Sequence, residues 1–292
     1  MQQNGSECDF SSTDSWVILS PIEQSIKRKI EAVGTPLKDW DINIYRGVLT
    51  GYNEAFIIST EKREEILANC QSEDERIRTD ELIRPILRGR DIKRYGYEWA
   101  EKYLIATFPS RHYDIEQYPA VKQHLLSFGE ERLEQTGKTY TINGEKVKAR
   151  KKTNNKWFET QDSISYWEDF SKPKIVWGNL NLTPNYALVE DNSFINAPSS
   201  MIVPASNYLL AILNSKLADF YIRLLGVTRN GGYFEYKPMF IEQLPIPQLD
   251  IENRELTQIT KLIENKNYTG IEYIVYNLYA LTQEEINYIN SL

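Results

Sequence analysis

The sequence has very few of the residues on which metal sites and thiol chemistry depend. Among its 292 residues there are two cysteines, Cys8 and Cys70, and two histidines, His112 and His124. Two thiols cannot build a disulfide framework, and a zinc site needs a cluster of Cys and His side chains. These scarcities favour a protein of a reducing compartment whose fold depends on its apolar core.

Long hydrophobic runs are also missing. The most apolar stretch, residues 201–213, is broken by Pro204, Ser206 and Asn207, whereas a membrane-spanning helix needs roughly 20 apolar residues. The start of the chain has neither a basic segment nor an apolar one, so we expect residues 1–15 to be a disordered polar leader rather than a signal peptide. We therefore expect no membrane contact and a cytoplasmic location.

An overall positive charge is absent too. The formal net charge is −7, which argues against a protein that coats nucleic acid through a general positive field. The charge is nevertheless segregated along the chain. Residues 84–111 carry seven cations against three carboxylates, and residues 138–156 carry seven against one, while residues 250–292 carry three against seven. Two local basic segments remain as candidates for binding an anion.

No catalytic motif is present. A methyltransferase acting on a base amino group needs an Asn/Asp-Pro-Pro-aromatic loop and a glycine-rich turn after a strand, and Thr183-Pro-Asn-Tyr186 has similar residues in the wrong order. A magnesium-dependent nuclease needs clustered carboxylates. Asp250, Glu264 and Lys266 could be forced into such a set, but they lie in an amphipathic tail where solvated charges are expected. We expect no catalytic residue, no metal and no cofactor in this chain.

Hydrophobic periodicity predicts an α+β protein with a mixed sheet and a C-terminal helical segment. Strands are expected at 41–48 and 55–58, around a Gly-Tyr-Asn turn, and at 103–107, 174–177 and 186–189; helices are expected at 22–33, 119–133 and 208–225. Two amphipathic stripes at 256–263 and 271–279, and a capping box formed by Thr282 and Glu285, predict a helical tail. We expect a domain over 16–248 and a helical segment over 249–292 that packs on its own body; the alternative is docking on a partner domain.

The first basic candidate is a turn that contains Arg88, Arg90, Lys93 and Arg94. Two arginines flank Gly89, so guanidinium groups and a flexible backbone coincide, as phosphate or guanine contacts require. The alternative is a charged surface turn in which Asp91 pairs with a neighbouring arginine.

Two further segments combine cations, amides and aromatic side chains. The stretch KVKARKKTNNK at 146–156 predicts a mobile basic loop anchored by Trp157; its candidate contacts are Lys148, Arg150, Lys151, Lys152 and Lys156. Arg229 and Tyr233 flank a shorter loop of the same character. The alternatives are a solvated loop for the first segment, and for the second a simple connection between a helix and a strand.

Seven stretches, in the right order from about residue 37 to 248, resemble the TaqI-like C-terminal specificity domain of adenine methyltransferases and single-chain restriction-modification enzymes. They are RGVLTGYNEAF (46–56), IRPILRGRDIKRY (83–95), YPAV (118–121), KWFE (156–159), KPKIV (172–176), YLLAILNSK (208–216) and LPIPQ (244–248). The tail at 271–282 also resembles the ending of such enzymes.

The resemblance implies a target-recognition domain that grips double-stranded DNA together with a methyltransferase domain. The catalytic half of that pattern is missing here, so we expect a fragment or a separate specificity subunit. Its parent would be a site-specific adenine DNA methyltransferase, possibly fused to an endonuclease, with S-adenosylmethionine bound in the catalytic domain. The resemblance also makes Arg46, Thr50, Tyr52 and Asn53 candidates for DNA contact; the alternative is a structural hairpin turn.

Sequence-specific recognition of duplex DNA is therefore the expected function. The runner-up is an interaction subunit that docks a methyltransferase or nuclease through its helical tail without reading DNA. A third possibility is a self-sufficient enzyme, which would have to transfer a methyl group by this chain alone.

Overall fold

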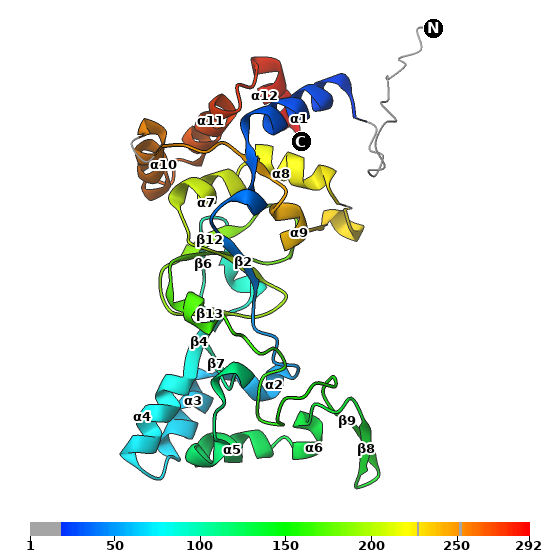
Figure 1. The fold of residues 1–292 in the computed structure, drawn as a ribbon, viewed down its shortest axis with the longest axis vertical. Coiled ribbons are helices and arrows are strands. Elements are labelled where there is room, and N and C mark those ends of the chain that lie inside the picture. Colours follow the sequence, from blue (N-terminus) through cyan, green and yellow to red (C-terminus); the bar gives the residue numbers. More distant parts are fainter. Residues whose placement is uncertain (1–18, 227, 251–252) are drawn as a thin grey trace.

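A central antiparallel sheet separates two hydrophobic cores in the computed structural model, which describes residues 19–226, 228–250 and 253–292. The sheet has the strand order β12 (Tyr186–Val189), β10 (Lys174–Trp177), β14 (Ser200–Val203) and β2 (Asn43–Arg46). Successive side chains of a strand point to opposite faces. Ile175 and Trp177 accordingly join one core and Val176 the other, so the sheet is covered on both faces (Figure 1).

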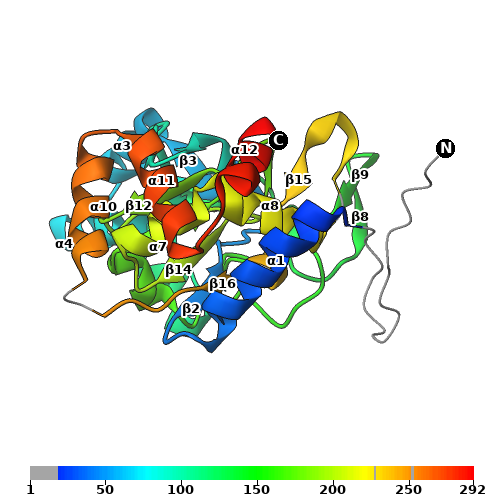
Figure 2. The same cartoon turned by 90° about the horizontal axis from the view of Figure 1, so that it is seen from above.

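Helices cover the upper face of this sheet and enclose the upper core, to which Ile30, Trp177, Leu210 and Tyr279 belong. They are α1 (Pro21–Val33), α7 (Asn207–Leu213), α8 (Lys216–Leu224), α9 (Pro238–Ile241), α10 (Arg254–Glu264), α11 (Tyr268–Leu278) and α12 (Gln283–Ser291). Figures 1 and 2 show α1 beside α12, so the two ends of the described chain meet in this layer. None of the described helices has both the length and the apolar character needed to cross a membrane.

A second four-stranded sheet lies in the lower lobe and holds the lower core, to which Phe56, Ile86, Leu104 and Phe170 belong. Its order is β13 (Phe194–Ile195), β4 (Ile83–Leu87), β7 (Lys102–Ile105) and β3 (Ile57–Ser59), with only the β13–β4 pair parallel. Around it lie α2 (Asn53–Phe56), α3 (Thr60–Ala68), α4 (Glu73–Leu82), α5 (Pro119–Leu126) and α6 (Glu130–Leu133).

Four two-stranded pairs complete the fold. They are β1 (Thr35–Pro36) with β16 (Pro245–Ile246), β5 (Ile92–Lys93) with β6 (Gly96–Tyr97), β8 (Thr139–Ile142) with β9 (Glu145–Lys148), and β11 (Leu180–Asn181) with β15 (Phe234–Glu235). The expected α+β class with a C-terminal helical segment is confirmed. The polar leader expected at 1–15 lies outside the described residues.

Local signals identified the helices at both ends of the described chain. Ser20 and Glu23 form a capping box at the start of α1, and Thr282 and Glu285 form one at the start of α12. The helical tail packs on α7 and α8, in agreement with the expectation that it covers its own body.

Three expected elements have different boundaries. The helix expected at 119–133 is two helices, α5 and α6, because Gly129 between them has φ 86°. The helix expected at 208–225 is also two, α7 and α8. Asn214 separates them, and its side-chain amide pairs with both backbone groups of Tyr186 on the central sheet. The strand expected at 55–58 begins only at Ile57, since Ala55 and Phe56 close the short helix α2.

Candidate nucleic-acid interface

Arg150 joins three separate segments of the lower lobe. Its guanidinium donates hydrogen bonds to the backbone carbonyls of Leu133 (2.7 Å), Thr50 (2.7 Å), Glu159 (2.8 Å) and Trp157 (2.6 Å). Only 4% of its surface is exposed, and burial lowers the pKa of Arg150 to about 10, so the charge persists at neutral pH. The expectation that Arg150 contacts DNA is therefore wrong for this fold, because its donors are already occupied by the protein.

The basic stretch at 146–156 is tied to the lower lobe by hydrogen bonds on both sides of Arg150. Its first residues belong to β9, which pairs with β8 in a hairpin. Beyond it, Thr153 donates from Oγ1 to Oε1 of Gln135 (2.8 Å), and the Asn155 amide donates to the carbonyl of Gln161 (2.9 Å). Gln135 is buried and itself donates to the carbonyls of residues 156, 159 and 160. In place of the mobile loop predicted at 146–156, the structure has a segment whose Asn155 amide donates to backbone carbonyls and whose Thr153 hydroxyl donates to the side chain of Gln135.

Residues 46–53 pack directly against this ordered stretch. The backbone N–H groups of Gln161 and Asp162 donate to the carbonyl of Leu49 (3.0 and 3.2 Å). Gly51 has φ 77°, and a Cβ atom added there would lie 2.5 Å from Oε1 of Gln161. Only glycine fits this contact, because both the backbone conformation and the available space exclude a side chain. We call residues 46–53 and 149–162 the paired loops.

Within the first of the paired loops, the side chains divide into buried and exposed ones. Thr50 is fully buried, and its hydroxyl donates to Oδ1 of Asn53 (2.7 Å) and accepts from the N–H of Tyr52 (3.1 Å). Thr50 therefore stabilises the turn and cannot reach DNA, which corrects the expectation for this residue. Arg46 and Asn53 are exposed, and Tyr52 is half-buried.

Several cations of the paired loops point to solvent. The exposed cations are Arg46, Lys151, Lys152, Lys156 and, on the adjoining strand β9, Lys148. The ring of Trp157 beside them is half-buried. Two of these cations act on Asp162: burial raises the pKa of Asp162, and Arg46 and Lys151 offset part of that rise. Tyr166 donates its hydroxyl to the carbonyl of Arg46 (2.8 Å) and stacks on Tyr45 with ring centroids 4.3 Å apart. The base of this loop is therefore fixed.

In the turn at 88–94, two of the four basic side chains are bonded to other groups of the protein. Arg88 makes a bidentate ion pair with Asp91, at 2.9 Å from Nε and 2.8 Å from Nη2, and Asp91 is 5% exposed. Arg94 donates to the carbonyl of Asn214 and to the carboxylate of Glu272, both at 2.9 Å, and so ties the turn to α11. These contacts agree with the alternative interpretation of a charged turn paired to Asp91. Arg90 and Lys93 remain exposed.

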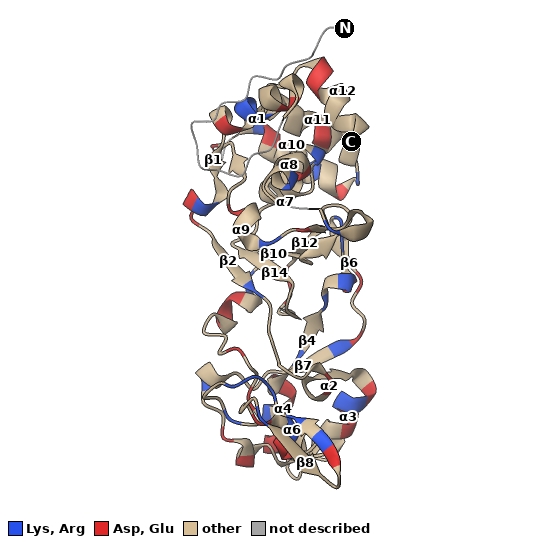
Figure 3. Ribbon diagram, turned by 90° about the vertical axis from the view of Figure 1, so that its right-hand side faces the viewer, with Lys and Arg blue, Asp and Glu red and all other residues tan. Residues whose placement is uncertain are grey.

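The third segment, residues 229–233, precedes β15, whose Phe234 belongs to the upper core. Arg229 pairs with Glu235 at 3.0 Å, and Tyr233 is 42% exposed. Figures 1 and 2 both show the strand β15 and the β8–β9 hairpin projecting to one side. Figure 3 faces that side and shows Lys and Arg around α6 and β8, with Asp and Glu among them. The structure thus gathers the candidates of the paired loops and leaves those at 88–94 and 229–233 as separate groups.

Two features were not found from the sequence. Gln135 gave no signal, because a single buried amide has no periodic pattern. Arg111 lies beside Trp167, with its guanidinium carbon 3.9 Å from the ring centroid; it was counted in a basic segment but not as a site residue. In the described ranges, no three His, Cys, Asp or Glu side chains gather as a metal ion would require.

The chain is similar to proteins of restriction-modification systems. A family model described as the TaqI-like C-terminal specificity domain matches residues 84–246. The fold is similar to that of MmeI, a type IIL restriction-modification enzyme solved in complex with DNA, at 12% identity and a TM-score of 0.57, over 88% of this chain and 37% of that one. The type IIG restriction endonuclease BpuSI also matches, at 12% identity and a TM-score of 0.47, over 84% of this chain and 28% of that one.

This chain thus spans little more than a third of MmeI, and no curated protein matches the sequence. The family match covers more than half of the sequence. It includes strands of both four-stranded sheets, the turn at 88–94 and most of the paired loops. On that match, the chain belongs to the family of TaqI-like C-terminal specificity domains.

Proposed function

We propose that this chain is the part of a restriction-modification protein that recognises a specific sequence in double-stranded DNA. Catalysis would belong to a methyltransferase domain, in the same polypeptide or in a separate subunit, which would bind S-adenosylmethionine and receive an adenine. Residues 16–248 would form the recognition domain and residues 249–292 its helical cover. Family membership supports the class of function, and the paired loops supply the surface for it.

The observation that carries the proposal is the burial of Arg150 between the paired loops. Direct readout of bases requires polar side chains held in fixed positions. If the loop were flexible, the entropic cost of ordering its side chains on binding would reduce the affinity for DNA. Arg150 fixes the backbone at Thr50, Trp157 and Glu159, while the cations next to these residues stay exposed. Rigid backbone beneath solvent-facing lysines is an arrangement that suits contact with phosphates and base edges.

The proposed contacts follow from exposure. They are Arg46, Tyr52, Asn53, Lys148, Lys151, Lys152, Lys156 and Trp157 in and beside the paired loops, with Arg90, Lys93, Arg229 and Tyr233 as outlying contacts. Arg88, Arg94, Arg150 and Thr50 are left out because each is committed to other groups of the protein. The formal net charge of −7 would limit non-specific binding and leave these local groups to dock the duplex.

A charge-matched comparison tests the proposal. In the first variant Lys151, Lys152 and Lys156 are replaced by glutamine; in the second, Lys38, Lys261 and Lys266, which are exposed in the upper layer, are replaced in the same way. Fluorescence anisotropy with a duplex selected from a random library gives the affinity at several salt concentrations. We expect the first variant to lose affinity and to reduce the slope of log K against log salt by about 0.9 for each lost phosphate contact, and the second to bind like the unchanged protein.

Two results would contradict the proposal. Equal losses in both variants would mean that the overall charge, and not the paired loops, controls binding. Failure of the unchanged protein to bind any duplex at low salt would favour the interaction subunit instead. Incubation with labelled S-adenosylmethionine and mixed DNA tests the third possibility, and we expect no methyl transfer by this chain alone.

A further inference from the structure

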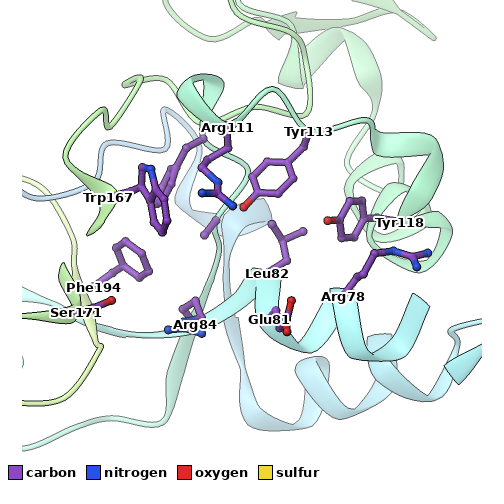
Figure 4. Close-up of a pocket in the computed structure, with 12 residues that line it drawn as sticks. Arg78, Glu81, Leu82, Arg84, Arg111, Tyr113, Tyr118, Trp167, Ser171 and Phe194 are labelled. Carbon is purple, nitrogen blue, oxygen red and sulfur yellow. The ribbon is translucent and has the colours of Figure 1, made fainter. Parts of the chain in front are cut away.

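A pocket in the lower lobe contains a group of side chains that the paired loops do not use. It has a volume of about 200 Å³ and lies between α4, the start of β4, the segment before α5 and residues 167–171 (Figure 4). Its walls include Arg84, Arg111, Glu81, Tyr113, Trp167 and Phe194. Four stretches distant in sequence, 78–84, 106–118, 167–171 and the one around Phe194, therefore converge on one opening.

The pocket has an excess of positive charge. No carboxylate lies within 4 Å of the guanidinium of Arg84 or Arg111 among the described residues. Arg78 also lines the pocket, and its buried Nε has no hydrogen-bond partner in the described part of the chain. Glu81 is the single carboxylate of the lining. Guanidinium groups without an acidic partner favour an anion, and their fork geometry matches two oxygens of a phosphate.

The pocket also offers flat aromatic surfaces. The guanidinium carbon of Arg111 lies 3.9 Å from the ring centroid of Trp167 and 5.8 Å from that of Tyr113. Figure 4 shows the Arg111 guanidinium between Trp167 and Tyr113, with Arg84 further down the same opening. Phe194 is held in place by Phe170 and Phe108, with centroids 4.5 and 5.2 Å away. Phe194 is buried and Arg111 covers one face of Trp167, so the half-buried ring of Tyr113 is the surface on which a nucleobase could stack.

We propose that this pocket binds a nucleoside phosphate. Arg84 and Arg111 would receive the phosphate, with Arg111 held on the face of Trp167. A base or sugar would lie against Tyr113, and Glu81 would accept a hydrogen bond from an exocyclic amino group or a hydroxyl. The nucleotide could be free in solution or could belong to a nucleic-acid strand. The inference does not depend on the paired loops, because none of the named lining residues belongs to them.

Isothermal titration calorimetry of the whole chain with deoxyadenosine monophosphate, deoxyadenosine and inorganic phosphate tests the site. We expect the monophosphate to bind more tightly than either of its parts. Arg111→Gln and Arg84→Gln should each weaken it at least about tenfold, as the loss of one charge-assisted hydrogen bond would. Arg76→Gln on the exposed side of α4 is the control and should leave it unchanged. Equal melting temperatures of all variants would exclude misfolding as the cause.

Competition then identifies the source of the nucleotide. If a single-stranded oligonucleotide displaces the monophosphate and Arg111→Gln weakens both, the ligand is part of a strand; if only the mononucleotide binds, it is free. The triple lysine variant should lose duplex binding but retain the monophosphate, so failure of one proposal is separable from failure of the other. No binding of the monophosphate, affinity equal to that of phosphate alone, or indifference to both arginine variants would overturn the inference.

Discussion

The guanidinium of Arg150 donates a hydrogen bond of 2.7 Å to the carbonyl of Thr50, a residue 100 positions earlier in the chain. Three more carbonyls, on Leu133, Trp157 and Glu159, accept from the same side chain. A single buried cation therefore holds together loops that no sheet connects. Each proposed contact of the paired loops depends on this arrangement.

We expect Arg150→Lys to destabilise the protein although it keeps the charge. A lysine ammonium has three donors on one nitrogen and cannot reproduce the planar fork that reaches four carbonyls. The loss should be roughly 3 kcal/mol, since hydrogen bonds to charged groups contribute about 1.5–3 kcal/mol each. Urea denaturation measures it, and Lys151→Gln, at an exposed neighbour, is the control. An unchanged free energy of unfolding in Arg150→Lys would refute the structural role.

Arg88 and Arg90 should respond differently to the same substitution. Arg88→Ala leaves the buried Asp91 without its partner and should cost roughly 3 kcal/mol of stability. Arg90→Ala removes an exposed guanidinium and should leave the melting temperature unchanged while it weakens DNA binding. Thermal melting and a salt-titrated binding assay on both variants give the comparison. A loss of affinity without loss of stability in Arg88→Ala would show that this arginine reaches DNA after all.

Glu285 makes the contact between α1 and α12 sensitive to acid. Burial alone would raise its pKa, but Lys29 (2.6 Å), the N–H of Thr282 (2.7 Å) and the hydroxyl of Ser25 (2.7 Å) outweigh that effect and lower the pKa to about 2. A carboxyl with a lowered folded pKa stabilises the protein above its ordinary value of 4.5, and this contribution is lost as the pH falls toward 2.

Glu285→Gln should therefore lower the melting temperature at pH 7 and have a much smaller effect at pH 3. The measurement is thermal unfolding of both proteins at the two pH values. A difference between them that stays constant with pH would contradict the ion pair.

Lys174 should make the stability rise with pH in alkali, as Glu285 does in acid. It is fully buried, and burial lowers its pKa to about 8, although its ammonium donates to the carbonyls of Phe170 (2.8 Å) and Asp191 (2.7 Å). Between pH 8 and its ordinary value of 10.5 the unfolded chain binds the proton more strongly, so stability rises with pH in that window. The melting temperature of the unchanged protein relative to Lys174→Met should rise from pH 7 to 9.5.

Local signals in the sequence were sufficient for most helices of the upper layer and for β2, β10 and β12 of the central sheet. They predicted neither α3 and α4 in the lower lobe nor the central strand β14. Ser20 with Glu23, and Thr282 with Glu285, define helix starts because both partners lie within one turn. The short aromatic and β-branched runs at 174–177 and 186–189 predicted β10 and β12, because the preference of these residue types for strands is also a local signal. The break between α7 and α8 was missed, although Ser215 caps the second helix by accepting from the N–H of Ala218.

The role of each cation could not be predicted in the same way. In Lys148-Ala-Arg150-Lys151-Lys152, composition does not reveal that Arg150 alone turns inward, because its four acceptors come from segments distant in the chain. The role of Gln135 was not predicted either, because its acceptors are carbonyls more than twenty residues away in the chain. The ion pair of Arg88 with Asp91 spans only three residues, and the sequence had offered it as an alternative to a DNA contact.

The sheet β12-β10-β14-β2 belongs to both cores, since Ile175 and Trp177 of β10 face one and Val176 the other. Removing α10–α12 would uncover part of the upper core and expose apolar residues such as Leu210 to water. The smallest stable recognition module therefore extends beyond the last matched residue, 246, and a graft of this specificity onto another enzyme must carry the final helices with it.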